Sequence, residues 1–182
     1  MSCNIRGQAE KAWMAYMKPF CLTQNVQQYR ALQILEAQVD PESGAMVGIE
    51  APFIAFGVTG MEPANGESNL DDDDQNQSGK VSIKVRTLAE NIYTDATKKV
   101  MLMTGGDFHD DLVGRVLDAI FQIQIPPDER QSLPDVLNAL DTPGILFEAV
   151  YRPSQGMPHP IGATYESDIL IPFMAYPSTT NE

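Results

Sequence analysis

The sequence predicts an α+β fold: a mostly antiparallel sheet of about four strands with helices packed on one face. Three observations support this class. Runs of alternating apolar and polar residues occur in both halves of the chain, and a strongly amphipathic helical segment lies between them. Turns rich in Gly and Pro separate these segments. Because 182 residues suffice for one sizeable core, we expect a single α+β domain over residues 1–182.

Residues 1–45 are predicted to form an N-terminal helical extension of this domain. Residues 5–18 carry apolar side chains at helical spacing, and Pro19 is expected to end that helix. Trp13 is interpreted as an anchor in the core, and an anchor at a subunit interface is the alternative. Residues 24–39 fit a helix and a short strand in part, and we favour the helix.

Residues 46–60 are rich in β-forming side chains and are predicted to be a strand. A long acidic loop over residues 61–78 follows. It contains four consecutive acids: Asp71, Asp72, Asp73 and Asp74. A calcium loop of the EF-hand type needs spaced ligands and a closing Glu, so a solvated loop is favoured over a calcium site. Since the loop joins two strand-like segments, the unit is expected to be a hairpin with a large tip.

The segment from Lys80 to Leu88 shows the clearest alternation of the chain. Its apolar residues should face the core, which places Lys80, Lys84 and Arg86 together on the opposite face. Three cations on one strand face stand out in a chain whose net charge is −13. An ordinary solvated face is the simpler interpretation, and contact with an acidic neighbouring subunit is the alternative.

A connection is predicted over residues 91–106, with one helical turn between Ala96 and Met103 and a break at the glycine pair that follows. From Asp107 onward, an apolar stripe at helical spacing continues to Phe121. Acids at the start of this segment suit the positive end of a helix dipole. The sequence therefore predicts an amphipathic helix that packs on the sheet.

A polar link and a second, shorter helix should follow. Pro126 and Pro127 are expected to end the amphipathic helix. Ser132 can cap a helix over residues 133–140, and Pro134 suits its first turn.

Two further strands are predicted near the C-terminus, over residues 145–151 and 163–176, with a proline-rich loop between them. In the longer strand, odd-numbered residues such as Ser167 share one face, and Glu166 lies on the other. Pro172 suggests an edge position or a bulge.

Net charge and cysteine content restrict the function classes. A net charge of −13 disfavours tight wrapping by DNA or RNA, because phosphates are repelled. The same charge would suit the wall of a channel through which DNA passes without binding, although solubility alone explains it more simply.

The cysteines and the hydropathy of the chain bear on its location. Cys3 and Cys21 form no disulfide framework, which favours a reducing cytoplasm. No apolar run approaches the roughly 18–20 residues that span a bilayer, and no signal peptide is recognised, so we expect no membrane association.

His109, Asp110 and Asp111 form the one compact group that resembles a catalytic or metal site. Adjacent residues on a helix diverge by about 100°, so these side chains should not converge, and a polar helix start is favoured. The chain lacks G-x-S-x-G and phosphate-loop patterns. We therefore predict that the protein is not an enzyme and has no catalytic, metal-binding or cofactor-binding residues and no cofactor.

The segments GKVSIKVRTL, DFHDDLVGRVLDAI, LPDVLNAL and GILFEAVY, in this order, resemble the tail-terminator and tail-completion (head–tail joining) proteins of tailed bacteriophages. The likeness rests on the order of the elements and on the helix pattern around Leu112, Val116 and Ala119. It extends over residues 51–177, whereas the longer N-terminal region and the acidic loop depart from the shorter members of the family.

This resemblance implies a subunit of a homo-oligomeric ring, commonly hexameric, at the head-proximal end of a phage tail. Such a structural protein terminates the tail tube, contacts tail-tube and neck proteins, and lets DNA pass through its channel without specific binding. It would be part of the virion and be assembled in the host cytoplasm. Candidates for a subunit interface or the channel are Trp13, Lys80, Lys84, Arg86 and the acids Asp71 to Asp74.

Three alternatives to the terminator stay open. One is a non-catalytic α+β domain that binds a ligand or a partner. Another is a different virion protein of the neck or tail tube. A hydrolase centred on His109 ranks last.

Overall fold

The structure is a computed structural model. It describes residues 4–36, 48–63, 76–94, 96–98, 100–140 and 144–178. Within these ranges the helices are α1 (Ile5–Gln24), α2 (Ala31–Glu36), α3 (Gly105–Ile120) and α4 (Leu133–Asn138). The strands of the main sheet are β1 (Gln27–Arg30), β2 (Phe53–Pro63), β3 (Gln77–Leu88), β6 (Leu146–Val150), β7 (Ser154–Gln155), β8 (His159–Ile161) and β9 (Thr164–Tyr176). A separate hairpin consists of β4 (Ile92–Tyr93) and β5 (Met101–Met103).

The main sheet has seven strands, in the order β1-β2-β3-β9-β6, with β7 and β8 also paired to β9. The α+β class predicted from the sequence is confirmed. The expected number of about four strands was too small, and the sheet is mixed, because β1 runs parallel to β2 while the other pairs are antiparallel. The additional strands come from residues 24–39 and from the proline-rich loop, where periodicity gives no clear strand signal.

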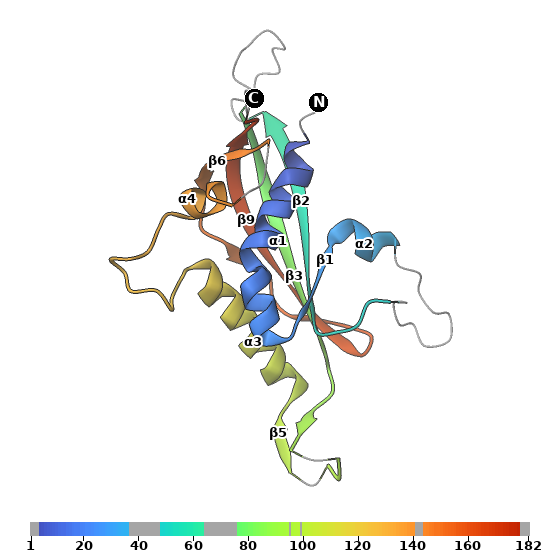
Figure 1. The fold of residues 1–182 in the computed structure, drawn as a ribbon. Coiled ribbons are helices and arrows are strands. Elements are labelled where there is room, and N and C mark those ends of the chain that lie inside the picture. Colours follow the sequence, from blue (N-terminus) through green and yellow to red (C-terminus); the bar gives the residue numbers. More distant parts are fainter. Residues whose placement is uncertain are drawn as a thin grey trace.

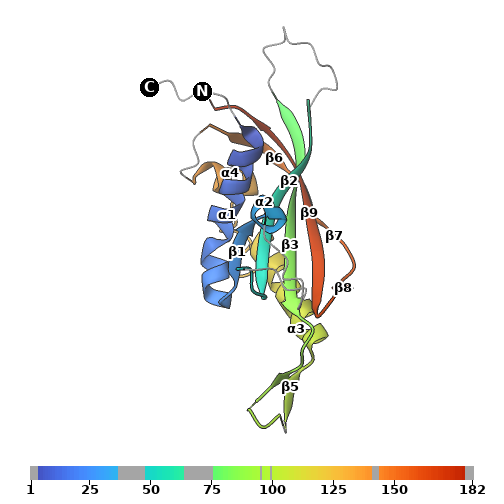
Figure 2. The ribbon, with the colours of Figure 1, turned by 90° about the vertical axis from the view of Figure 1, so that its right-hand side faces the viewer.

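Three helices cover one face of this sheet: α1, α3 and α4 (Figures 1 and 2). The core between the helices and the sheet is apolar, and Val81, Ile83 and Val85 of β3 are all buried in it, as their alternation predicts. Trp13 of α1 is fully buried and meets Tyr16 edge-on, with ring centroids 5.8 Å apart. Its interpretation as a core anchor is therefore confirmed, and it offers no exposed surface to a neighbouring subunit.

Helix α1 does not end at Pro19, contrary to the sequence prediction. It continues to Gln24 and stops at Asn25, whose φ of 53° is left-handed. A proline inside a helix removes one backbone donor. Here the apolar face continues past it, because Cys21 is buried in the same core as Met17. Packing of that face outweighs the local cost of the proline.

The helix favoured for residues 24–39 was wrong in its first part. Residues 27–30 form β1, paired with β2 in the register Gln27↔Phe53 to Arg30↔Phe56. Only the short helix α2 follows. Ala31 of α2 lies over Gly57 of β2, where an added Cβ would approach its Cβ to 2.8 Å. Gly57 alternates with the core residues Phe56 and Val58, so α2 begins on the face of the sheet opposite α1, α3 and α4.

The described residues of the segment from Ala96 to Met103 contain no helix, contrary to the prediction, and Met101–Met103 form β5, which pairs with β4. Gly105 does not break a helix but begins α3, behind the N-cap Thr104. A side chain at Gly105 would lie 2.5 Å from the backbone of Ala89, so only glycine fits this contact. The hairpin projects beyond the end of the main sheet (Figures 1 and 2).

The amphipathic helix α3 is confirmed, with Leu112, Val113, Val116 and Ile120 buried against the sheet. It ends at Ile120, before the two prolines that were expected to stop it. The second helix is also confirmed as α4, and the Ser132 hydroxyl accepts a hydrogen bond from the Asp135 N–H at 3.3 Å.

The hairpin expected around the acidic loop is present, since β2 and β3 pair antiparallel from Phe53↔Arg86 onward. Asp71, Asp72, Asp73 and Asp74 lie outside the residues that the structure describes. The strands predicted near the C-terminus correspond to β6 and β9, but β9 is central in the sheet rather than an edge.

Pro172 is accommodated in β9 because β6 ends beside it. Its carbonyl oxygen accepts a hydrogen bond from the Tyr151 N–H at 2.9 Å, just beyond β6. In an extended strand the N–H and C=O of one residue point to the same side. The donor that proline lacks would thus face the gap between β6 and β7.

Candidate functional site

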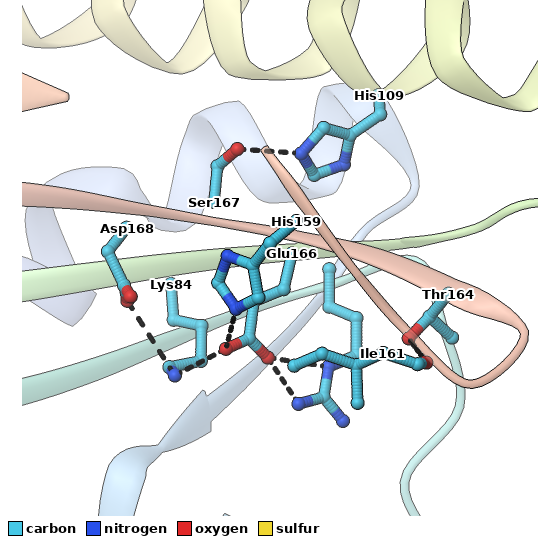
Figure 3. A network of polar contacts seen from close by, with 9 residues as sticks. Lys84, His109, His159, Ile161, Thr164, Glu166, Ser167 and Asp168 are labelled. Atoms are coloured by element: carbon cyan, nitrogen blue, oxygen red, sulfur yellow. Dashed lines mark hydrogen bonds and ion pairs between the residues drawn. The ribbon is translucent and has the colours of Figure 1, made fainter. Parts of the chain in front are cut away.

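The cations Lys84 and Arg86 bind a carboxylate of their own chain, which the sequence reasoning missed. Lys84 Nζ lies 2.5 Å from Glu166 Oε1, and Arg86 Nε donates to Glu166 Oε2 at 2.8 Å. The second guanidinium contact, from Arg86 Nη2, reaches the same Oε2. The register of β3 with β9 produces this arrangement, because Arg86 lies opposite Glu166 and Lys84 opposite Asp168. Figure 3 shows Lys84 between the two carboxylates.

Glu166 is only 2% exposed, although it lies on the face of the sheet away from the main helices. Burial alone raises the pKa of a carboxyl group, but the hydrogen bonds and charges of Lys84 and Arg86 outweigh burial and lower the pKa of Glu166. His159 of β8 adds a third basic group, with Nε2 3.8 Å from Glu166 Oε1. The ion pairs of Glu166 join β9 to β3, and His159 brings β8 next to the same carboxylate.

The intrachain partner changes the interpretation of the basic strand face. Lys84 and Arg86 are neither simply solvated nor dependent on an acidic neighbouring subunit for a counter-charge. Lys80, at the other end of this face, is exposed. The alternation of β9 placed Glu166 and Asp168 on one face, so a signal for this pairing existed. The sequence did not show that β3 and β9 are neighbours.

His109 is completely buried, contrary to the expectation of a polar helix start. Its Nδ1 lies 2.9 Å from the Thr87 hydroxyl, and its Nε2 lies 2.8 Å from the Ser167 hydroxyl. Burial is the main cause that lowers the pKa of His109, so its ring is neutral at pH 7, with one nitrogen donating and the other accepting. In Figure 3 this pair lies on the helix side of β9, across the strand from Glu166.

A serine hydrogen-bonded to a histidine can act as a nucleophile in a hydrolase. Here Ser167, His109 and Thr87 each have no exposed surface, so no substrate reaches the pair in this conformation. As predicted, the neighbouring acids do not converge on His109: Asp110 is exposed, and Asp111 binds Arg115 at 2.8 Å. The trio of Thr87, His109 and Ser167 fastens α3 to β3 and β9.

Over the part of the chain that the structure describes, no group of three or more His, Cys, Asp or Glu residues could hold a metal ion. None of the helices in those same ranges combines the length and the apolar composition that crossing a bilayer requires. Cys21 is buried, which raises the pKa of its thiol to about 11 and keeps it protonated at neutral pH.

The β4–β5 hairpin, here named the hairpin arm (described residues 92–94, 96–98 and 100–103), has exposed apolar residues in and just before strand β5. Val100 is 58% exposed, Met101 51% and Leu102 67%. The ammonium of Lys98 lies 5.9 Å from the centroid of the Tyr93 ring. Apolar side chains gathered on a projecting segment are typical of a surface that another protein covers.

A shallow groove, here named the helix groove, lies between the end of α1 and the last turns of α3. Its volume is about 400 Å³, and its lining residues are Phe20, Thr23, Gln24, Arg115, Asp118, Ala119 and Gln124. The Tyr16 hydroxyl donates to the Ala119 carbonyl at 2.8 Å and ties the two helices together there. Three exposed apolar residues are close in sequence to residues that line the groove: Leu22, Phe121 and Ile123.

The chain matches no model of a protein family and no curated protein sequence with which it was compared. Its candidate functions therefore rest on the residues and surfaces described above.

Proposed function

We propose that this chain is a structural subunit of a tailed-bacteriophage virion, which forms a homo-oligomeric ring that terminates the tail tube and joins the tail to the neck. The main support for the proposal is the hairpin arm, which projects from the fold (Figure 2) and has exposed apolar residues at and next to its strand β5. A ring needs two different surfaces on each subunit, one of which reaches the next subunit. An arm that leaves the body of the fold and exposes Val100, Met101 and Leu102 along one of its strands has the shape and chemistry for this task.

The rest of the fold is compatible with such a role. Helices α1, α3 and α4 form a layer on one side of the sheet, and Lys84 and Arg86 are paired within the chain with Glu166 and Asp168. A net charge of −13 would let DNA pass through the channel of the ring without binding to it. Ring size follows the resemblance, which implies six subunits, with tail-tube and neck proteins as partners. The protein would be assembled in the host cytoplasm.

The proposal is tested by measuring the molar mass of the purified protein with light scattering, at several concentrations and salt levels, and by negative-stain electron microscopy of the same samples. We expect a discrete oligomer that forms ring-shaped particles. Leu102→Asp should weaken association by about 10-fold or more, since each buried leucine contributes about 2 kcal/mol. Met157→Asp is the matched control, because Met157 is an equally apolar residue, 88% exposed, away from the arm.

A chain that stays monomeric at every concentration, and that does not end tube growth in a tail-assembly reaction, would contradict the proposal.

One alternative function has an observation in its favour. The helix groove falls within the size range of small-ligand pockets, which would suit a non-catalytic ligand- or partner-binding domain. That domain would be monomeric, and neither Leu102→Asp nor Met157→Asp would change its mass.

A further inference from the structure

The chain carries two unlike apolar surfaces, one projecting and one hollow. The hairpin arm projects from the fold and exposes Val100, Met101 and Leu102 at and next to strand β5. The helix groove offers a hollow whose apolar lining includes Phe20 and Ala119. A projecting surface that fits a hollow elsewhere on the same chain gives a head-to-tail contact between copies, and such a contact closes into a ring if the rotation allows it.

The arm cannot fill the groove of its own chain. It leads into the first turn of α3, whereas Arg115, Asp118 and Ala119 line the groove from the last two turns. The fifteen-residue separation between Met103 and Asp118 corresponds to about 22 Å along a helix. The arm also points away from α1 and α3 (Figures 1 and 2). The occupant that the geometry allows is therefore the arm of a second copy.

Charge favours the same pairing. Residues 92–103 carry Lys98, Lys99 and one acid, Asp95, so the net charge of this stretch of sequence is +1, and Lys98 is exposed. The groove contributes Asp118, while its cation Arg115 is already bound by Asp111 at 2.8 Å and by the Gln24 side-chain oxygen at 2.8 Å. A basic arm entering a groove with an acid on its rim is favourable between copies of a chain that is otherwise acidic.

We infer that the hairpin arm of one subunit docks in the helix groove of the next, with Leu102 and its neighbours against Phe20 and Ala119. This inference rests on the proposed ring and specifies its subunit contact. The arm supplies the apolar anchors, and α1 and α3 supply the receiving site. The contact is heterologous, so each subunit uses its arm on one side and its groove on the other.

Disulfide cross-linking tests the contact directly. In the double variant Leu102→Cys/Gln124→Cys, one new thiol lies on the arm and the other on the groove. Mild oxidation is expected to give a ladder of covalent oligomers of two, three and more chains. Mixing the two single variants should give only dimers. Met157→Cys/Gln124→Cys is the matched control, and it should give no ladder, as Met157 lies outside the arm. Cys3 and Cys21 are present in every variant, so each single variant measures their background.

The possible failures are distinct. A discrete oligomer in light scattering without a ladder above the control would overturn the arm-to-groove contact and leave the proposed ring intact. A band for a single chain with an internal disulfide would show that the arm reaches its own groove, which also overturns the inference. A monomer in light scattering with no cross-link between chains would contradict both the contact and the ring.

Discussion

Lys84 and Glu166 lie on neighbouring strands with ammonium and carboxylate 2.5 Å apart, and Arg86 binds the other oxygen of that carboxylate. The side chain of Glu166 is only 3% exposed, so its charge is stabilised by these two cations rather than by water. On the outer face of the sheet, one carboxylate of β9 therefore binds two cations of β3.

Replacing this carboxylate should destabilise the fold. Glu166→Gln is expected to lower the free energy of unfolding by about 3 kcal/mol, because it leaves Arg86 and Lys84 without their common counter-charge. Asp168→Asn is the control, since Asp168 is 37% exposed and lies 3.7 Å from the Lys84 ammonium. It should cost no more than about 1 kcal/mol. Urea unfolding measures both, and equal losses would contradict the dominant role of Glu166.

Lowering the pH should remove the stabilisation that Glu166 gives to the fold. The folded-state pKa of Glu166 is lowered relative to the unfolded chain. Its stabilisation is therefore present above the ordinary glutamate pKa of about 4.3 and is lost as the pH falls through the lower folded value. Unfolding free energies of the native protein and of Glu166→Gln should converge below about pH 4. Burial also lowers the pKa of His109, which acts from about pH 6.5 downward in both proteins, and the charge of Glu166 partly opposes that lowering in the native protein only. A gap that persists undiminished at pH 2 would be inconsistent with this linkage.

The buried histidine needs both of its hydroxyl partners. Ser167→Ala removes the partner of His109 Nε2 and leaves a ring nitrogen buried without a hydrogen bond. We expect a loss of about 1–3 kcal/mol in the free energy of unfolding. Ser154→Ala, at an exposed serine of β7, should change it by less than about 0.5 kcal/mol. Thermal and urea unfolding provide the comparison, and the idea fails if the two variants are equally stable.

Two glycines of α3 should respond in opposite ways to alanine. At Gly105 a Cβ would lie 2.5 Å from the Ala89 backbone, so Gly105→Ala must displace the start of the helix from the end of β3 and is expected to destabilise the protein. At Gly114 nothing lies within 4 Å of an added Cβ. Gly114→Ala should therefore stabilise the helix by about 0.5–1 kcal/mol. Melting temperatures of the two variants against the native protein decide the point, and a shift of the same sign would contradict it.

Local patterns predicted the elements whose periodicity is strong. The alternation over Lys80–Leu88 and from Thr164 to Tyr176 gave β3 and β9 with their buried faces, and the stripe from Leu112 to Ile120 gave α3. Weakly patterned segments were assigned wrongly. Residues 27–30 became a strand because they pair with β2, and Met101–Met103 became a strand because it pairs with Ile92 and Tyr93. In both segments pairing with another strand decided the conformation: β2 lies 26 residues further along the chain from β1, and β4 lies 8 to 11 residues before its partners in β5.

The candidate site residues were likewise predicted only in part. The sequence indicated Lys84 and Arg86 as candidate residues but did not identify their partner. It noted His109 but interpreted it as part of a polar helix start. Glu166 stands 80 residues from Arg86, and Ser167 stands 58 residues from His109. Only the register between β3 and β9 and the packing of α3 on both strands bring these groups together.

By itself, then, the sequence determined the α+β class, the buried faces of the long strands and the apolar face of α3. These follow from side-chain periodicity, which a chain carries before it folds. The tertiary structure alone decided which strands are neighbours, that Glu166 pairs with Lys84 and Arg86, that His109 is buried, and that an arm with exposed apolar residues projects from the fold. These properties depend on contacts between residues far apart in the chain, whose free energy local periodicity does not encode.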